Sequence, residues 1–592
     1  MKDAIRAPGA ARPAPLENDI SVDVAPAAAL DVVSFTYPNG ERPALSRVTF
    51  KVAAGEMVGV MGATGAGKST LAKCLNRIVP EFEGGVFAGA VRIGGRPLGG
   101  ARVCEVAPRV GVVFQDFEAQ LFSTNVAHEV AFAMEQVGME REEMARRIRP
   151  ALEAVGLGGF EHRDPTLLSG GEKQRLAIAS VLALRPAVIV LDEPTTDLDP
   201  EGKAEVFALI DRLREQGISL LVIEHEAEVL RTAARLLLLR EGEIIAEGAP
   251  HDLMTRLELL EECGVHPPDL NRVLAALGIA AHAASVDEAE ALIRRALPRL
   301  GAAAQALDTP AAPDTAARGA NSAASAQPLA EMRAVSFNYP GGPLVLDSID
   351  LRIASGEFIA IIGQNGSGKT TLAKHLVGLL RPSSGVVMLN GRDRSTMRAS
   401  EAAAQAGYVF QNPDHQIFAA TVEEEIAFGP RNFKLAPGEI ERRCDEVLRA
   451  VGLENAREFD PFLLGKGERQ RLAVASVLAL RPRLLILDEP ATGLDYREQR
   501  RMMALVAELN RGGMAIVMIT HTPWLVAEYA SRVVLMRRGR KLYDGDVREF
   551  FACDDLLSSS SFRPPEATEL SRRFGTVALG PDELAAWLKE RG

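Results

Sequence analysis

Two stretches of the chain share one pattern of apolar and polar positions. Leu168–Glu193 reads LSGGEKQRLAIASVLALRPAVIVLDE, and Leu464–Glu489 reads LGKGERQRLAVASVLALRPRLLILDE. In both, a Gly-rich turn precedes an amphipathic helix, an Arg-Pro break and an apolar run that ends in Asp-Glu. The unbroken runs Val188–Leu191 and Leu484–Leu487 are typical of strands buried on both faces of a parallel sheet. The acidic pair that ends each run lies where open parallel sheets bind ligands.

A strand, a loop and a helix are predicted upstream of each repeat. The apolar runs Met57–Met61 and Phe358–Ile362 lead directly into GATGAGKST (Gly62–Thr70) and GQNGSGKTT (Gly363–Thr371). Both loops fit GxxxxGK[ST] in the strand–loop–helix context that this motif requires. Their glycines let backbone N–H groups close around a phosphate chain, and the following helix begins there with its positive dipole end. The sequence therefore predicts two nucleotide-phosphate sites.

Two side chains of each loop carry the expected chemistry. Lys68 and Lys369 reach the β- and γ-phosphates of a nucleotide, and Ser69 and Thr370 place a hydroxyl on Mg²⁺. We therefore expect ATP and Mg²⁺ at both sites.

A tyrosine ends the first predicted strand of each half. Asp31–Tyr37 and Ala334–Tyr339 alternate like half-buried strands and are each followed by Pro, a turn signal. Each tyrosine either packs on the core at the strand end or provides an aromatic platform for an adenine ring.

A glutamine follows a second apolar strand of each half. Val112–Phe122 reads VVFQDFEAQLF, and Tyr408–Phe418 reads YVFQNPDHQIF. Gln115 and Gln411 either contact the metal or the attacking water, or are ordinary surface residues. Their repetition favours the functional interpretation.

A helical lobe and a histidine complete each repeat. Residues 123–165 and 419–461 carry many charges and few strand signals, so we expect helices there. Further on, the predicted strands SLLVIEH and AIVMITH end in His225 and His521. Each histidine follows the acidic Glu of its half by 32 residues (225 − 193 and 521 − 489). This equal spacing favours a function over a structural role.

Composition places the chain among globular proteins with several domains. It has 592 residues, 47% of them hydrophobic, and a net charge of 67 − 79 = −12, which argues mildly against a nucleic-acid binder. The five cysteines are scattered without a CxxC motif, which indicates free thiols in a reducing compartment. No apolar run is long enough for a membrane span, and the N-terminus lacks the apolar region of a secretory signal.

The repeats divide the chain into two halves. The tails His266–Arg295 and Arg563–Arg591 resemble each other, and both are expected to be packing appendages. Gly301–Pro328 is rich in Ala, Pro, Thr and Ser, which is typical of a flexible linker. The predicted boundaries are 1–27 for a disordered lead, 28–265 for the first domain, 266–299 for its helical extension, 300–328 for the linker, 329–555 for the second domain and 556–592 for its extension.

The phosphate loop, Gln segment, LSGGE turn, LDE strand and His, in this order and twice, resemble the ATP-binding cassette (ABC) family across nearly the whole chain. The resemblance implies an α/β fold with two tandem P-loop nucleotide-binding domains, each with a RecA-like core, an inserted helical lobe and a small C-terminal helical extension. It also implies ATP hydrolysis coupled to transport, with the two halves paired head to tail. Each ATP would then lie between one half's phosphate loop and the other half's LSGGE turn.

The resemblance also implies roles for individual residues. Glu193 and Glu489 would polarise the attacking water, and His225 and His521 would contact the γ-phosphate; these four are the predicted catalytic residues. The predicted metal ligands for Mg²⁺ are Ser69, Gln115, Asp192, Thr370, Gln411 and Asp488. The predicted ATP-binding residues are Tyr37, Gly62, Ala63, Thr64, Gly65, Ala66, Gly67, Lys68, Ser69, Thr70, Tyr339, Gly363, Gln364, Asn365, Gly366, Ser367, Gly368, Lys369, Thr370 and Thr371. The predicted signature residues are Ser169, Gly170, Gly171, Glu172, Gly465, Lys466, Gly467 and Glu468.

A narrower resemblance concerns the energy-coupling-factor subfamily, which drives uptake of vitamins and metal ions. QNPDHQIF, the paired tails and the LGKGERQR turn are similar to that subfamily, whereas QDFEAQLF departs from it at residues 116–119. The resemblance implies a transmembrane coupling subunit and a small substrate-capture membrane protein as partners. It also implies a peripheral position on the cytoplasmic face of the cell membrane.

The chief alternative is a soluble twin-cassette ATPase that acts on the ribosome. Such proteins typically have a long, charged, helical linker suited to RNA, whereas Gly301–Pro328 has few charges and carries three prolines. The net charge also argues against a nucleic-acid partner. A DNA-repair cassette protein is disfavoured because neither half contains a zinc-type Cys cluster or a long coiled coil.

The two predicted ATP sites differ in one turn. Ser169-Gly170-Gly171 of the first half corresponds to Gly465-Lys466-Gly467 of the second, so a hydroxyl is lost and an ammonium is gained. With head-to-tail pairing, this altered turn faces the phosphate loop of the first half. We therefore expect a slower first site, built on Lys68, and an intact second site, built on Lys369.

Overall fold

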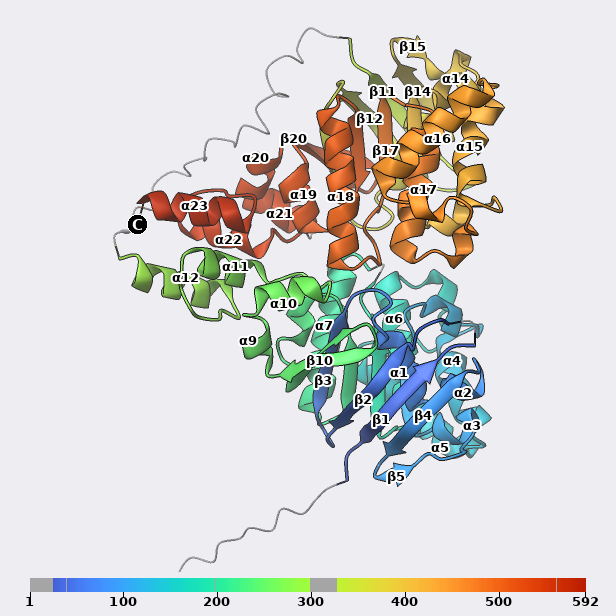
Figure 1. Ribbon diagram of the computed structural model, residues 1–592, viewed down its shortest axis with the longest axis vertical. Coiled ribbons are helices and arrows are strands. Elements are labelled where there is room, and N and C mark those ends of the chain that lie inside the picture. Colours follow the sequence, from blue (N-terminus) through green and yellow to red (C-terminus); the bar gives the residue numbers. More distant parts are fainter. Residues whose placement is uncertain (1–24, 39, 197, 299–326, 561, 592) are drawn as a thin grey trace, which may run out of the picture.

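The computed structural model describes residues 25–38, 40–196, 198–298, 327–560 and 562–591. Two halves of the same α/β architecture are stacked on each other, as Figure 1 shows, and the predicted fold class is confirmed. Each half combines a four-stranded antiparallel sheet, a six-stranded and mostly parallel sheet, and surrounding helices. The predicted lead up to residue 24 and the predicted linker from 300 to 326 lie outside the described residues.

The first half has the sheet orders β2-β1-β4-β5 and β10-β9-β3-β8-β7-β6. Its strands are β1 (Ala28–Thr36), β2 (Leu45–Val52), β3 (Met57–Gly62), β4 (Val86–Ile93), β5 (Arg96–Pro97), β6 (Val110–Val113), β7 (Val188–Asp192), β8 (Leu220–Ile223), β9 (Arg235–Arg240) and β10 (Glu243–Gly248). Its helices are α1 (Lys68–Leu75), α2 (Ile78–Glu81), α3 (Val103–Val106), α4 (Val126–Gln136), α5 (Arg141–Ala154), α6 (Gly170–Leu182), α7 (Pro200–Glu215), α8 (Ala227–Leu230), α9 (Pro250–Leu253), α10 (Leu257–Glu262), α11 (Asp269–Ala276) and α12 (Val286–Ala296).

The second half repeats this order, with the sheets β12-β11-β14-β15 and β16-β17-β18-β13-β19-β20. Its strands are β11 (Ala330–Asn338), β12 (Leu344–Ile353), β13 (Phe358–Ile362), β14 (Ser384–Leu389), β15 (Arg392–Asp393), β16 (Ala406–Val409), β17 (Leu484–Asp488), β18 (Ala515–Ile519), β19 (Arg532–Arg537) and β20 (Arg540–Asp546). Its helices are α13 (Lys369–Val377), α14 (Ala399–Ala403), α15 (Val422–Asn432), α16 (Pro437–Val451), α17 (Lys466–Leu478), α18 (Tyr496–Arg511), α19 (Pro523–Tyr529), α20 (Val547–Ala552), α21 (Asp554–Ser560), α22 (Glu566–Arg573) and α23 (Pro581–Arg591).

The central strands are apolar throughout because both faces of the parallel sheet are covered. In β7, Ile189 and Leu191 belong to one core, which the helices of the lobe and α7 complete. Val188 and Val190 belong to another, which includes α1 and the antiparallel sheet. Alternate side chains thus point into two different cores, which explains the unbroken run in the sequence.

Three neighbouring strands bring the candidate site residues together. In the first half β3, β8 and β7 are parallel neighbours. Their carboxyl ends lead into the phosphate loop, His225 and the Asp192-Glu193 pair, respectively. Parallel strands end at one edge of the sheet, so three motifs that are far apart in the sequence meet there.

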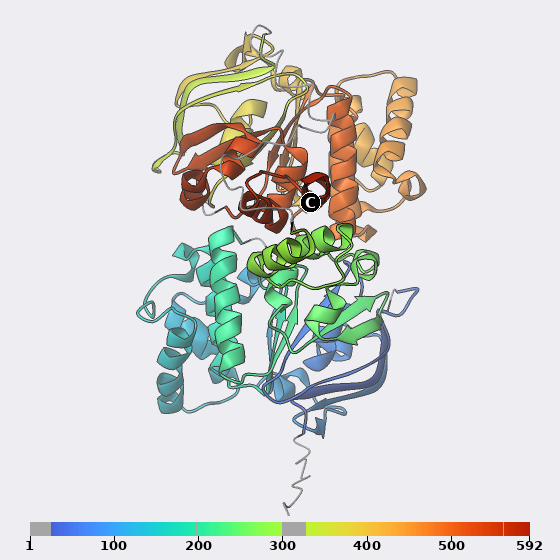
Figure 2. The same cartoon turned by 90° about the vertical axis from the view of Figure 1, so that its left-hand side faces the viewer.

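The C-terminal extensions of the two halves pack on each other. Helices α11 and α12 lie beside α22 and α23 in Figures 1 and 2, and all four contribute to one apolar core. Leu270 and Leu274 of the first extension and Leu570 and Leu588 of the second are fully buried in it. The extensions therefore join the halves through a core of their own.

An aromatic cluster lies where the halves meet. The ring of His266 stands 4.5 Å from that of Tyr496 and 5.4 Å from that of Trp524, measured between centroids. Burial, together with the charges of Arg272 and Arg500, lowers the pKa of His266 to about 3. The imidazole is therefore neutral in the folded protein at neutral pH.

Candidate nucleotide sites between the halves

Each phosphate loop is closed by its own lysine. Lys68 Nζ donates hydrogen bonds to the carbonyl oxygens of Gly62 (2.8 Å) and Ala63 (2.9 Å). Lys369 Nζ does the same to Gly363 (2.7 Å) and Gln364 (3.0 Å). Both ammonium groups thus point into the loop where a phosphate chain is expected.

A glycine is required where each loop enters its helix. Gly67 has a φ of 100°, and a Cβ there would stand 2.4 Å from the carbonyl oxygen of Ala44. Gly368 has the same φ, and a Cβ there would stand 2.9 Å from the carbonyl oxygen of Val345. These positions need glycine for both conformation and space.

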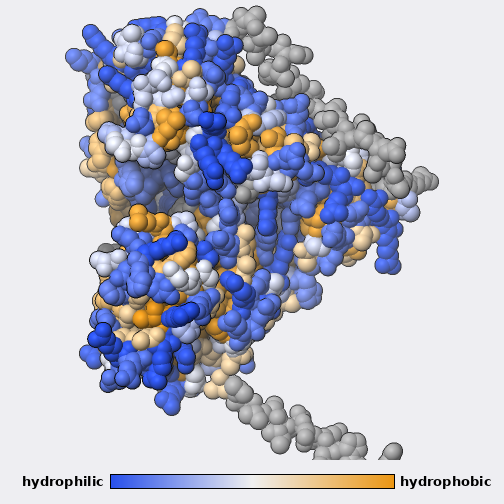
Figure 3. Space-filling model, turned by 180° about the vertical axis from the view of Figure 1, so that it is seen from behind, coloured by the Kyte–Doolittle hydropathy of each residue, from blue (hydrophilic) through white to orange (hydrophobic). Residues whose placement is uncertain are grey.

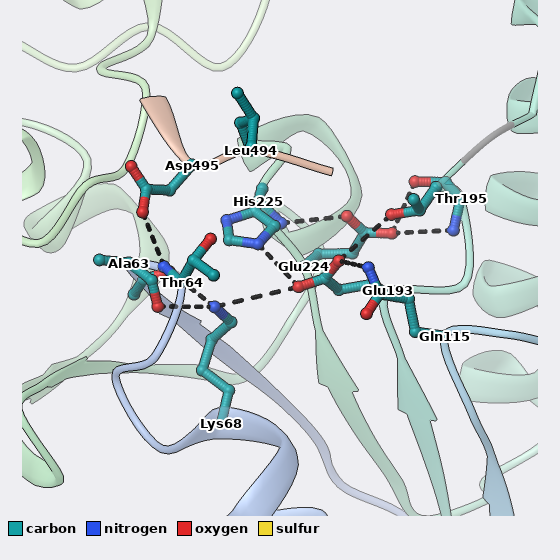
Figure 4. Close-up of polar contacts among 12 residues, drawn as sticks. Ala63, Thr64, Lys68, Gln115, Glu193, Thr195, Glu224, His225, Leu494 and Asp495 are labelled. Carbon is teal, nitrogen blue, oxygen red and sulfur yellow. Dashed lines mark hydrogen bonds and ion pairs between the residues drawn. The ribbon is translucent and has the colours of Figure 1, made fainter. Parts of the chain in front are cut away.

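Glu193 is held from several directions in the first site. Its carboxylate accepts a hydrogen bond from Gln115 Nε2 at 2.7 Å and lies 2.7 Å from His225 Nε2, as Figure 4 shows. Lys68 Nζ stands 4.0 Å away. Burial alone would raise the pKa of Glu193, but the bond to His225 and the charges of His225, Lys68 and Lys466 lower it to about 2.

Glu489 is held more loosely in the second site. His521 Nε2 stands 3.3 Å from Glu489 Oε1 without the alignment of a hydrogen bond, and the His521 N–H donates to Oε2 at 3.3 Å. Burial raises the pKa of Glu489 above its ordinary value, against the charge of Lys369. Gln411 is exposed and makes no side-chain hydrogen bond within the described ranges, unlike Gln115. The two catalytic candidates therefore differ in environment.

Both halves offer oxygen ligands suited to Mg²⁺. Asp192 is buried, and within the described part of the chain its Oδ1 has no hydrogen-bond partner. Burial raises the pKa of Asp192 to about 6, while a hydrogen bond from Ser69 opposes that rise. In the second half the hydroxyls of Thr370 (3.4 Å) and Tyr408 (2.5 Å) donate to Asp488. A carboxylate beside a hydroxyl is the donor set that Mg²⁺ prefers, so the residues present fit this ion.

Each phosphate loop is bonded to the opposite half. The N–H of Thr64 donates to Asp495 Oδ2 at 2.8 Å, a contact visible in Figure 4. The N–H of Asn365 donates to Asp199 Oδ2 at 3.4 Å. Each aspartate also accepts, through its other oxygen, a hydrogen bond from the first turn of its own helix, α18 or α7. The two sites therefore lie between the halves in a head-to-tail arrangement.

The Gly-rich turns begin α6 and α17 differently. Ser169 Oγ accepts a hydrogen bond from the Glu172 N–H at 3.3 Å, and the Glu172 carboxylate accepts one from the Ser169 N–H at 2.7 Å. This reciprocal pair is a capping box. In α17 only the second bond remains, from the Gly465 N–H to Glu468 at 2.9 Å, because Gly465 has no side chain.

The predicted tyrosines lie at the start of the phosphate-loop helices. The Tyr37 hydroxyl is 3.1 Å from Thr70 Oγ1, and its ring meets Phe35 edge to face. Tyr339 is 3.4 Å from Thr371 Oγ1 and 42% exposed. Both rings thus pack at the strand end and reach the phosphate loop.

A buried carboxylate beside the first site escaped the sequence analysis. Glu224 accepts hydrogen bonds from the Oγ1 (2.6 Å) and N–H (3.1 Å) of Thr195 and from the N–H of His225 (3.0 Å). Burial raises its pKa to about 7. The second half has Thr520 and Ala491 at the positions of Glu224 and Thr195. The sequence does show that the two halves differ here, because the first half reads VIEH before and at His225 and the second reads MITH before and at His521. Only the fold shows that Glu224 is bonded to Thr195.

Comparisons with known proteins agree with this geometry. Residues 45–196 and 346–492 both match the family model described as "ABC transporter". The chain is 43% identical over 553 residues to a "Putative ABC transporter ATP-binding protein" of Caldanaerobacter subterraneus subsp. tengcongensis, covering 93% of this chain and 96% of the relative. A protein of the same description from Methanosarcina acetivorans is 39% identical, covering 97% and 95%.

Solved structures similar to part of the chain include a component of a transporter complex. It is cbiO1 from Clostridium perfringens, described as part of the ABC transporter complex cbiONQ, with 33% identity and a TM-score of 0.37. The match covers 41% of this chain and 99% of that one. None of the helices in the described ranges has the length and apolar character that a membrane crossing requires.

Proposed function

The chain belongs to the ABC transporter family, and from this premise we propose that it powers micronutrient uptake through separate membrane subunits of energy-coupling-factor type. As an ABC ATPase with two cassettes, it hydrolyses ATP to ADP and phosphate. The cargo in this proposal is a vitamin, a vitamin precursor or a metal ion. The QNPDHQIF segment and the paired, mutually packed extensions support the subfamily assignment.

The observation that carries the catalytic part is the pair of sites between the halves. Glu193 and Glu489 act as general bases toward water, and His225 and His521 orient them and contact the γ-phosphate. Ser69 with Asp192, and Thr370 with Asp488, would hold Mg²⁺, which neutralises charge on the phosphates when bound. Gln115 and Gln411 complete these two ligand sets.

Exposed phenylalanines support docking of membrane subunits. Phe122 and Phe418 are each 60% exposed, so they do not belong to the core of a cassette. Each meets a second exposed phenylalanine edge to face, Phe132 at 4.4 Å and Phe428 at 4.7 Å between ring centroids. Figure 3 shows patches of apolar surface on both halves, including the side away from the extensions.

A groove adjoins the pair in the first half. It encloses about 400 Å³ beside α4 and α6, and Ile78, Val103, Leu121 and Val181 contribute to its lining. We assign to it, and to the matching surface of the second half, an apolar helix of the transmembrane coupling subunit. A small membrane protein would then capture the substrate, and this chain would lie on the cytoplasmic face.

Purification from native membranes tests the proposal. The tagged full chain should retain a coupling subunit and a small capture protein, and charged substitutions Phe122→Glu and Phe418→Glu should release them while ATP binding persists. Leu542→Glu is the matched control, because β20 lies at the opposite edge of the sheet from β16 and Leu542 is also exposed. Retention of ribosomes in place of membrane proteins would overturn the proposal, as would equal release by all three variants.

A further inference from the structure

The turn that begins α17 carries an ammonium group where α6 has none. Lys466 is the first residue of α17, and Gly170 holds that place in α6. The Lys466 side chain is partly exposed and forms no ion pair with any residue that the structure describes.

The next turn of the same half leaves room for this lysine. A Cβ at Gly493 would stand 2.1 Å from Lys466 Nζ and 3.2 Å from its Cε. The side chain therefore extends across Gly493, which also has a φ of 68°. In the first half, Asp197 stands at the position of Gly493, and Gly170 stands at the position of Lys466. The lysine and the glycine beneath it are thus a combination found in the second half alone.

This position directs the ammonium toward the first site. Asp495, two residues beyond Gly493, accepts the hydrogen bond from Thr64 in the phosphate loop of the first half. Lys466 is also one of the positive charges that act on the carboxylate of Glu193, across the boundary between the halves. Lys68 approaches the same carboxylate from the first half. Two ammonium groups from opposite halves therefore flank one site.

We propose that Lys466 binds the γ-phosphate of the ATP held in the first site, and that its charge replaces the hydroxyl that its own turn lacks. The proposal rests on ATP binding between the halves, the catalytic part of the proposed function. An ammonium–phosphate hydrogen bond is charge-assisted, and such bonds are stronger than those from a neutral hydroxyl. The second site receives Ser169 and Gly170, so its Gly-rich turn has no lysine at this position. A lysine of the first half, Lys203, acts on Glu489 there, but it is paired with Glu226 of its own half. The first site thereby distinguishes ATP from ADP by charge, and the second by a hydroxyl.

Nucleotide titration of the full-length chain tests this role. Lys369→Ala disables the second site, and calorimetry then measures binding of Mg·AMP-PNP and of Mg·ADP to the first. Lys466→Gln in this background should weaken AMP-PNP binding about tenfold to a hundredfold, as expected for loss of a charged hydrogen bond. ADP binding should change less than about twofold, because ADP has no γ-phosphate, and Lys466→Arg should retain most of the AMP-PNP affinity.

Two controls keep the result interpretable. Arg497→Gln removes another cation at the boundary, whose guanidinium donates to the carbonyl oxygen of Glu262, and should leave the AMP-PNP to ADP ratio unchanged. If Lys466→Gln does not unfold cooperatively, Lys466→Gly replaces it, because α6 folds with glycine there. Unchanged AMP-PNP affinity, or an equal loss for both nucleotides, would overturn the proposal. The assay contains no membrane partner, so its failure is distinct from failure of the transport assignment.

Discussion

The sharpest prediction is that Glu489→Gln abolishes most ATP turnover whereas Glu193→Gln leaves most of it. Glu193 is already engaged by Gln115 and His225 at 2.7 Å, and its pKa is well below its ordinary value. Glu489 has no well-aligned bond at Oε1, and burial raises its pKa. A general base works best when its pKa lies near the operating pH, so Glu489 is the better base.

The magnitude follows from the two Gly-rich turns. The first site lacks the serine hydroxyl, and loss of a hydrogen bond to a charged group costs about 1.5–3 kcal/mol, which is about tenfold to a hundredfold. This loss appears in kcat when the serine bond strengthens in the transition state, and Lys466 does not restore it if it binds ATP and the transition state equally, because uniform binding leaves kcat unchanged. The first site then supplies about a tenth of the turnover or less. Removing a catalytic base costs about 10²–10⁴-fold at its own site.

Phosphate release by purified full-length variants at saturating Mg·ATP measures these fractions. Glu489→Gln should retain about a tenth of the rate or less, and Glu193→Gln about nine tenths, given the partition above. The double variant sets the background. Restoring the turn with Gly465→Ser and Lys466→Gly should raise the residual rate of Glu489→Gln. Equal damage by the two single substitutions, or greater damage by Glu193→Gln, would refute the assignment.

Three further predictions concern stability. His266 has a folded pKa of about 3 and an ordinary value near 6.5. Its contribution to the free energy of unfolding is therefore complete above pH 6.5 and is lost as pH falls toward 3, and about 2 kcal/mol has been lost at pH 5. His266→Phe should therefore raise the melting temperature relative to wild type more at pH 5 than at pH 8, and parallel pH profiles would contradict this. Glu224 has a folded pKa of about 7, above its ordinary value near 4.5. It therefore begins to lower the free energy of unfolding as pH rises above 4.5, and the full loss of about 3 kcal/mol is reached above pH 7. Glu224→Gln should stabilise the protein at pH 8 but not at pH 4.5, as calorimetric melting would reveal; the same shift at both would count against a buried acid. Leu274→Asp places a charge in the shared core of the extensions, and limited proteolysis should then cut near α22 and α23 as well as near α11. Cleavage confined to the first extension would show that the two do not depend on each other.

The sequence was sufficient to predict features that depend on a short, continuous segment of the chain. Both phosphate loops, the strand that ends in Asp192 and the helical lobes were predictable, because each is a local pattern of glycine spacing or apolar periodicity. The environment of Glu193 was not, since Gln115 and His225 reach it from other strands of the sheet. The exposure of Phe122 could not be predicted either, because an apolar residue in a connecting segment is consistent with core or surface.

Contacts between the halves were the least predictable. The pairing of Thr64 with Asp495 and the direction of Lys466 depend on how two folded units dock, which no local pattern encodes. The carboxyl group of Glu224 belongs with Thr195 only after β7 and β8 have become neighbours. At this position the first half has a buried, hydrogen-bonded carboxylate, whereas the second half has Thr520.

The shared core of α11, α12, α22 and α23 has a consequence for how the nucleotide sites open and close. If this core stays intact when the nucleotide sites separate, the halves remain joined at that end, and opening is a rotation about it. Reclosure is then an intramolecular step at a fixed effective concentration, independent of how much protein the cell contains.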